Sequence, residues 1–172
     1  EFYSDNLDAT LASLVEGFTI NGYTPLYIGE RINSVQNEYS DNYSVIKDCN
    51  MIIGEMKDTK SELAKQLLGT AWAIRSICYY NLLIRFCEPY NPISAEDKLG
   101  LPLIDRFDME AKPSRSDLKT TVSFIEEGFK NAIRYDISDT DYIFTSDVAK
   151  AYLTKLYFWT QQWEKAIQYA EE

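Results

Sequence analysis

Tyrosine, arginine and asparagine side chains gather in one stretch of the sequence, residues 18–40, that follows neither helical nor strand periodicity. Sugars are held by stacking of their C–H faces on exposed aromatic rings, with hydrogen bonds from planar polar side chains. This stretch offers both kinds of group. The candidate saccharide-binding residues are Tyr23, Tyr27, Arg31, Asn33 and Tyr39. The alternative is that the tyrosines only pack this irregular loop, about 18–40, onto neighbouring helices.

Residues that support catalysis or metal binding are missing from the chain or wrongly spaced. There is no histidine, which removes most Ser-His-Asp, Cys-His and histidine–metal chemistry. The three cysteines show neither a CxxC pair nor metal-site spacing. Asp136, Asp139 and Asp141 could offer carboxylates to Ca²⁺, but the glycine and the distal glutamate of an EF-hand loop are absent. We therefore predict no enzyme activity, no metal site and no cofactor.

Charge and hydropathy argue against two further classes of protein. The chain has 17 Lys and Arg residues against 27 Asp and Glu residues, a formal net charge of −10, and no basic cluster. Affinity for nucleic acids depends largely on basic side chains that meet phosphates. No apolar run approaches the length of a membrane-spanning helix. We expect neither a nucleic-acid partner nor a transmembrane segment in this chain.

The longest helical pattern, residues 61–86, is the element around which the others must pack. Its two adjacent apolar stripes predict burial over more than half of the helix circumference. Ser61 is the expected N-cap. Arg75 lies within the buried surface, one turn before Tyr79, and a buried guanidinium is costly unless it is paired. We expect both to be structural core residues, with Arg75 in an ion pair or against carbonyl groups that anchor neighbouring helices.

Two further helical patterns flank this central one. The first begins at Asp41 or Asn42, and the second follows a predicted cap at Ser116. An irregular connection with four prolines, about 87–115, joins the central helix to the second of them, and loops of that length are usually functional. Because no strand pattern of note appears, the sequence predicts an all-α fold.

The last part of the chain, about 146–172, matches the consensus of a tetratricopeptide (TPR) helical hairpin. Ala166 would let its second helix approach the first closely, while Tyr157 and Trp163 would fill the space around the turn. These three residues are therefore expected in the core. One such hairpin cannot bury its own apolar face, so it needs stacked neighbours. We expect residues 1–172 to form a single α-helical domain of stacked TPR-like hairpins with long irregular loops.

Five motifs in the chain together resemble the SusD/RagB family of outer-membrane glycan-binding lipoproteins. Each is weak alone, but their order and spacing make the combination specific. The motifs are the Tyr43–Ile53 helix with Asn50, the Ala71-xxx-Arg75-xxx-Tyr79-xx-Leu82 pattern, the Gly100-Leu101-Pro102-Leu103 element, the segment from Lys112 to Ile133, and the hairpin from Ser146 to Ala170. The chain departs from the pattern at Cys87 and at Glu127-Gly128, where the family has Gly and Asp-Leu. We expect the second departure to weaken one helix contact.

The resemblance implies a function, a partner and a location. It implies non-enzymatic capture of a polysaccharide or oligosaccharide at the cell surface, with a SusC-type TonB-dependent outer-membrane transporter, by a lipoprotein anchored through an N-terminal lipid upstream of this segment. In the family, the loop between the first two helices contributes to the glycan site. The chain resembles the helical N-terminal part, so it is expected to be a fragment. The alternative function is a TPR-like scaffold whose main role is docking to another protein. The identity of the glycan is left open by the sequence.

Overall fold

The computed structural model describes residues 33–58, 60–108, 110, 112–137 and 144–172, and within these ranges the side chains from residue 38 onward. Two compact units are present, Glu1–Ser40 and Asp41–Glu172. Of the first unit, only the start of helix α2 (Asn33–Met56) is described. The helical spacing of Leu7, Leu11, Leu14 and Phe18 also predicts a helix over residues 4–18, which lie outside the described residues. The account below concerns the second unit.

Helices dominate the described residues, which confirms the predicted all-α class. After α2 the chain forms α3 (Glu62–Phe86), α4 (Leu118–Arg134), α5 (Ser146–Trp159) and α6 (Trp163–Glu171). As predicted, Ser61 caps α3, and its side chain accepts a hydrogen bond from the backbone N–H of Ala64. The last residue of the helix is Phe86, and the C-cap Cys87 has an extended backbone, two residues before Pro89.

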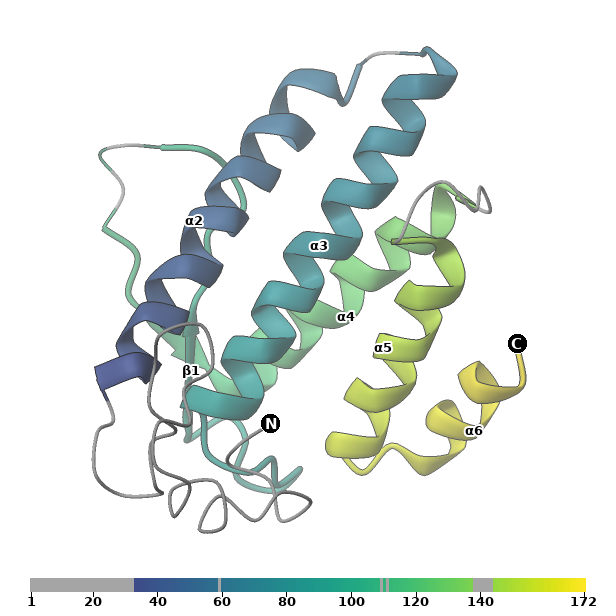
Figure 1. The fold of residues 1–172 in the computed structure, drawn as a ribbon. Helices are drawn as coiled ribbons and strands as arrows, with labels where there is room; N and C mark the ends of the chain where they lie inside the picture. The colour runs from purple at the N-terminus through teal and green to yellow at the C-terminus, as the bar shows by residue number, and fades with distance from the viewer. Residues whose placement is uncertain (1–32, 59, 109, 111, 138–143) are drawn as a thin grey trace, which may run out of the picture. The chain divides into compact units, whose positions relative to one another are not determined.

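The central helix α3 packs against α4 and α5, α4 packs against α5, and α5 packs against α6 (Figure 1). Twelve residues of α3 are buried, as its two apolar stripes predict. The core therefore lies between α3, α4 and α5. Its largest fully buried side chains on these helices are Leu68, Tyr79, Leu82, Leu83, Leu118, Ile125, Phe129, Leu153, Leu156 and Tyr157.

Two short strands stand within and at the end of the connection predicted to be irregular. Strand β1 (Leu99–Pro102) pairs antiparallel with β2 (Arg115–Asp117), and the register is irregular between the two paired ends. Their three or four residues are too few for a visible alternation of apolar and polar side chains. A Cβ atom on Gly100 would lie 2.0 Å from Thr121 Oγ1 and 2.5 Å from the Asp117 carbonyl oxygen, so only glycine lets β1 approach the start of α4.

Two predicted helix starts are corrected by the structure. The N-cap of α4 is Asp117 rather than Ser116, and its carboxylate accepts a hydrogen bond from the Thr120 N–H. Ser116 instead belongs to β2, and its hydroxyl donates to the carbonyl of Leu101 across the strand pair. Helix α2 begins at Asn33 rather than near residue 41. Residues 33–40 contain neither glycine nor proline, so nothing in them interrupts a helix.

Candidate functional site

The saccharide-binding residues predicted from the sequence are mostly outside the described part of the chain. Tyr23, Tyr27 and Arg31 fall there, and of Asn33 the structure gives only its place at the start of α2. Tyr39 lies in the second turn of α2 and is half-buried. Most of this set thus falls outside the described residues, and the site in the early loop stays a prediction.

Arg75 is buried in the middle of α3, with a side chain only 3% exposed. Its Nη1 donates hydrogen bonds to Asn50 Oδ1 at 2.6 Å and to the Asp105 carbonyl oxygen at 3.4 Å. The guanidinium carbon lies 4.1 Å from the centre of the Trp72 ring and 5.4 Å from that of Phe124. Among the described residues its hydrogen-bond partners are thus carbonyl oxygens. Of the two arrangements expected for Arg75, an ion pair or contact with carbonyl groups, the structure has the second.

These contacts satisfy the charge and connect three elements of the chain. Burial lowers the pKa of Arg75 from its ordinary value, although an arginine stays protonated throughout the physiological range. Asn50 belongs to α2, Arg75 to α3, and Asp105 to the segment that follows β1. A guanidinium that is hydrogen-bonded and stacked at once can be retained in a core without leaving an unpaired charge.

The segment after β1 runs beside α2 (Figure 1), where hydrogen bonds from side chains of α2 and α3 hold it. Its carbonyl and N–H groups find partners in side chains from α2 and α3, so a stretch with no secondary structure of its own has a defined path. The hydrogen bonds run from Tyr43 Oη to Pro102 O (2.9 Å), from Asn50 Nδ2 to Ile104 O (2.9 Å), from Tyr79 Oη to Ile104 O (3.2 Å) and from Ile104 N to Tyr79 Oη (2.8 Å).

Two neighbouring pockets lie between α2 and this segment, and together we call them the α2 groove. It has two parts, of about 370 and 550 Å³, that share Arg106 and Phe107. Both volumes fall within the usual range for small-ligand sites, about 300–1,000 Å³. The first part is also lined by Tyr43, Lys47, Ile104 and Asp108, and the second by Asn50, Met51, Ile53, Gly54, Glu55, Lys57 and Asp105.

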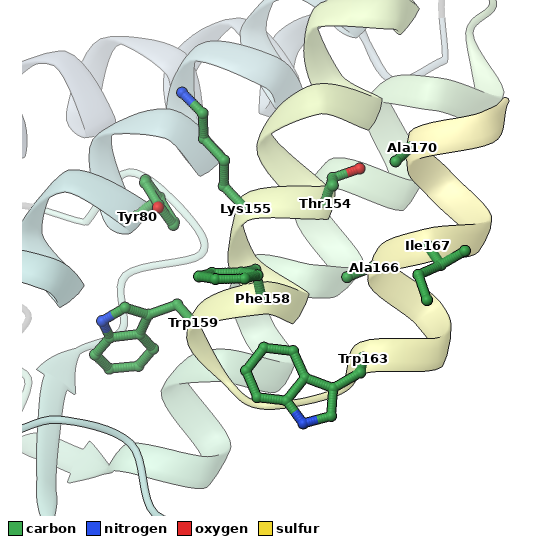
Figure 2. A pocket seen from close by; sticks show the side chains of 9 residues that line it. All are labelled: Tyr80, Thr154, Lys155, Phe158, Trp159, Trp163, Ala166, Ile167 and Ala170. Carbon is green, nitrogen blue, oxygen red and sulfur yellow. The ribbon is translucent and has the colours of Figure 1, made fainter.

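A second hollow, which we call the α5–α6 pocket, lies where α3, α5 and α6 meet (Figure 2). Its volume is about 510 Å³, and apolar and aromatic side chains supply most of its lining. The rings of Phe158 and Trp163 meet edge to face across the α5–α6 turn, with centres 5.2 Å apart. Its lining residues are Tyr80, Thr154, Lys155, Phe158, Trp159, Trp163, Ala166, Ile167 and Ala170.

Trp163 differs from its expected place in the hairpin core. Its side chain is 49% exposed, and it packs on Phe158, which is itself 66% exposed. Trp163 is the first residue of α6, where its ring reaches over the outer side of the turn rather than between the two helices. Tyr157 and Ala166 are both buried, as the TPR consensus predicts. Aromatic surface is therefore open to solvent at this end of the hairpin.

A buried tyrosine links α5 to α4 through a carboxylate. Tyr157 Oη donates to Glu126 Oε1 at 2.9 Å, and Lys130 Nζ donates to the same oxygen at 2.6 Å. Burial alone would raise the pKa of Glu126, but the hydrogen bonds from Lys130 and Tyr157 lower it below its ordinary value. Burial, followed by the bond to Glu126, raises the pKa of Tyr157. The group fastens the hairpin to the rest of the core.

The described residues offer few groups for chemistry. Within them, no three His, Cys, Asp or Glu side chains lie close enough together to hold a metal ion. Burial raises the pKa of Cys49 to about 11 and that of Cys78 to about 12, so both thiols stay protonated and act as small apolar side chains. Of the Asp136, Asp139 and Asp141 group, only Asp136 is described, and it is exposed. What the geometry offers is binding surface.

Comparison with known proteins places the chain in a family. The family model described as SusD-like, "starch-binding associating with outer membrane", matches residues 9–158. The chain belongs to this SusD-like family. The comparison with curated proteins gives no match. Among the described helices of this SusD-like chain, none combines the length and the apolar character that a membrane span requires.

Solved structures of SusD-like proteins share the fold at low sequence identity. A putative sugar-binding protein from Bacteroides vulgatus is 23% identical, with a TM-score of 0.71 over 79% of this chain and 32% of its own. A SusD superfamily protein from Bacteroides thetaiotaomicron is 22% identical, with a TM-score of 0.71 over 85% and 36%. A laminarin-binding SusD-like protein is 21% identical, with a TM-score of 0.63 over 79% and 29%. The chain spans about a third of the length of these structures.

Sequence reasoning missed both hollows, for different reasons. The α2 groove depends on Phe107 and Arg106, which stand in a proline-flanked segment without periodicity, and only hydrogen bonds to residues distant in sequence bring them beside α2. The α5–α6 pocket had a visible signal, because Phe158 does not fall on the apolar stripe that carries Leu153 and Tyr157. One exposed aromatic residue is ordinary, but Phe158 lies with the exposed Trp163 and Ile167, and a contiguous apolar patch indicates an interaction surface.

Proposed function

We propose that the protein captures a polysaccharide or oligosaccharide at the cell surface without altering it chemically. The observation that carries this proposal is the family match over residues 9–158, because the description of that family names both starch binding and association with the outer membrane. A relative of the same fold is named for binding laminarin, which supports a glycan as the ligand. The exposed aromatic rings of the second unit are surfaces of the type on which sugars stack.

The proposal includes a partner and a place. The partner is a SusC-type TonB-dependent transporter, and the protein acts on the outer face of the outer membrane, held there by an N-terminal lipid. The 172 residues correspond in this proposal to a helical, TPR-like N-terminal domain, since the chain spans about a third of the length of its structural relatives. Co-purification of the protein with a β-barrel transporter, without crosslinking, tests the partnership.

Glycan capture itself is tested with the protein as its gene encodes it. Affinity electrophoresis through gels that contain single polysaccharides should show retarded migration in at least one of them. We further propose that the early loop contributes through Tyr23 and Tyr27, so the Tyr23→Ala/Tyr27→Ala double variant should lose that retardation. A retardation that the double variant keeps would place the site elsewhere, whereas no retardation in any gel would contradict glycan capture.

A second candidate function has its own supporting observation. The α5–α6 pocket presents Phe158, Trp163 and Ile167 to solvent, and a contiguous apolar surface of this kind is typical of protein interaction sites. A TPR-like scaffold that mainly docks to another protein would use such a surface. This alternative predicts that Phe158→Ala weakens co-purification with the transporter while glycan retardation is unchanged. Loss of glycan retardation in that variant would favour a sugar-stacking role for the pocket instead.

A further inference from the structure

The geometry points to the α2 groove as a saccharide-binding site for a neutral glycan, in addition to the site expected in the early loop. This inference rests on the proposed function, since it concerns which surface meets the glycan and which class of glycan it accepts. Five observations carry it. They are an exposed aromatic ring, a backbone segment held by hydrogen bonds, hydrogen-bond donors and acceptors beside the ring, a balance of positive and negative charges, and an elongated shape.

An aromatic ring is exposed at the middle of the groove. Phe107 is 46% exposed although it is one of the larger apolar side chains of the chain, and it belongs to the lining of both parts of the groove. A ring that lines two neighbouring hollows can be covered by a ligand that runs through both. The C–H face of a sugar is a suitable partner, because it is apolar and flat. The edge of the sugar ring carries hydroxyl groups, which can form hydrogen bonds with polar groups beside Phe107.

The backbone that leads to Phe107 is held by hydrogen bonds although it has no secondary structure. Buried side chains hold the two residues that precede Arg106, since Ile104 bonds to Asn50 and Tyr79 and Asp105 bonds to Arg75. A preorganised binding surface loses less conformational entropy when the ligand arrives. The buried Arg75 thus supports the surface, because its guanidinium holds the inner side of the segment whose outer side presents the ring.

Groups that donate and accept hydrogen bonds surround the ring. The Arg106 side chain is 80% exposed and offers several N–H donors. Lys47, on α2, adds an ammonium group to the first part of the groove. Asp105 and Glu55 line the second part, and their carboxylates accept hydrogen bonds. Sugar hydroxyls are donors and acceptors at once, so a lining with both kinds of group suits them.

The charges along the groove favour a neutral glycan over an acidic one. Three cations, Lys47, Lys57 and Arg106, stand beside three carboxylates, Glu55, Asp105 and Asp108. Two of the cations already have acidic neighbours, because Arg106 Nη2 lies 3.7 Å from Asp108 Oδ2 and Lys47 Nζ lies 3.4 Å from Asp48 Oδ1. The chain as a whole carries a net charge of −10, which repels a polyanion.

The groove is long enough for several sugar units. Its lining residues on α2 extend from Tyr43 to Glu55, and twelve residue steps of α-helix rise about 18 Å. Near one end of the groove there is free space beside Gly54, since a Cβ atom on this residue would meet no other atom within 4 Å. A side chain at this position would fill the groove without disturbing the fold.

Two variants and a matched control test the site in the protein as its gene encodes it. Phe107→Ala removes the ring, Gly54→Leu fills the groove from the helix side, and Phe158→Ala removes an exposed ring from the α5–α6 pocket. The readout is affinity electrophoresis and isothermal titration with a panel of neutral and uronic-acid polysaccharides. We expect Phe107→Ala and Gly54→Leu each to weaken binding of a neutral glycan about tenfold or more, which corresponds to about 1.4 kcal/mol, and Phe158→Ala to leave it unchanged.

The possible outcomes distinguish a failure of the α2 groove as the binding site from a failure of glycan capture as the function. A neutral glycan that binds the unaltered protein, and binds Phe107→Ala and Gly54→Leu equally well, would overturn the α2 groove while leaving glycan capture intact. Binding of uronic-acid polysaccharides alone would overturn the neutral class. Binding of no glycan by the unaltered protein would contradict the proposed function and this inference with it. Thermal unfolding of each variant verifies that a loss of binding is not a loss of fold, because Phe107 and Gly54 are both at the surface.

Discussion

At the scale of single residues, Arg75 shows how a buried charge can position a segment of the protein surface, here the one that leads to Phe107. Its guanidinium lies against the Trp72 and Phe124 rings, and its Nη1 donates to Asn50 and Asp105, so the buried charge has both aromatic and hydrogen-bonding partners. In return for the cost of burial, the guanidinium holds the segment that leads to Phe107 in place through the hydrogen bond to Asp105. A shorter apolar residue in its place would leave the Asn50 amide oxygen and the Asp105 carbonyl without this donor.

Arg75→Ala is therefore expected to lower the free energy of unfolding by about 2–4 kcal/mol, because it removes a packed side chain and leaves buried acceptors unsatisfied. Urea denaturation followed by circular dichroism measures this. Arg106→Ala is the matched control, since that arginine is largely exposed and its removal should change the free energy of unfolding by less than about 0.5 kcal/mol. Equal effects of the two substitutions would contradict the role of Arg75.

Glu126 gives a second residue-scale prediction, on pH. Its pKa in the folded chain lies below the ordinary 4.5, so its ionised form stabilises the fold fully above that value and the contribution disappears as pH falls through the lowered pKa. Glu126→Gln should reduce the unfolding free energy at pH 7 by about 1–2 kcal/mol. The difference between the two proteins should shrink below pH 4.5, as denaturation curves from pH 7 to acid pH would reveal. A difference that stays constant into acid would show that the carboxylate charge is not involved.

At the scale of elements, α3 and α4 approach closely at one point where both carry small residues. A Cβ atom on Gly128 would lie 2.2 Å from Ser76 Oγ, and both residues are buried. Gly128 was expected to weaken a helix contact, because the family has leucine there. With Ser76 opposite, a Cβ atom at residue 128 would force the Ser76 side chain to shift, so glycine lets the two helices approach closely at this point.

Gly128→Ala should therefore destabilise the chain by about 1–3 kcal/mol through overpacking, despite the better helix propensity of alanine. The same change at Gly54, where a Cβ meets open space, should stabilise α2 by about 0.5–1 kcal/mol. Thermal or urea unfolding compares the two directly. Ser76→Ala should restore part of the stability of Gly128→Ala, because it removes the oxygen that clashes. A Gly128→Ala protein as stable as the unaltered one would show that α3 and α4 can separate at little cost.

At the scale of the whole chain, the excess of acidic residues sets which ligands can approach. With 27 acidic and 17 basic residues, long-range fields oppose anionic polymers, while an uncharged glycan is indifferent to them. Binding of a neutral glycan should consequently change less than about twofold between about 50 and 500 mM NaCl, over which the Debye length falls severalfold. Isothermal titration at the two salt concentrations measures this. Affinity that falls steeply with salt would indicate a charged ligand.

The sequence predicted helices better than it predicted sites. The two apolar stripes of α3, the cap at Ser61 and the burial of Tyr157 and Ala166 follow from spacing alone, because helical periodicity is a local property. The start of α4 was misplaced by one residue, since Ser116 and Asp117 are both good caps and the choice depends on the pairing of Ser116 with β1. The strands were missed because each is held by its partner rather than by its own pattern.

Sequence alone determined the all-helical class, the central helix with its buried arginine, the TPR-like hairpin and membership of the SusD-like family through motifs in order. Tertiary structure alone decided what Arg75 binds, that Gly128 lies against Ser76, that Trp163 is exposed, and that Phe107 stands in a groove beside α2. The physical reason is the range of the interactions. Periodicity and caps act within a few residues, whereas the bond from Asn50 to Ile104 joins groups 54 positions apart, and no local pattern encodes such a pairing.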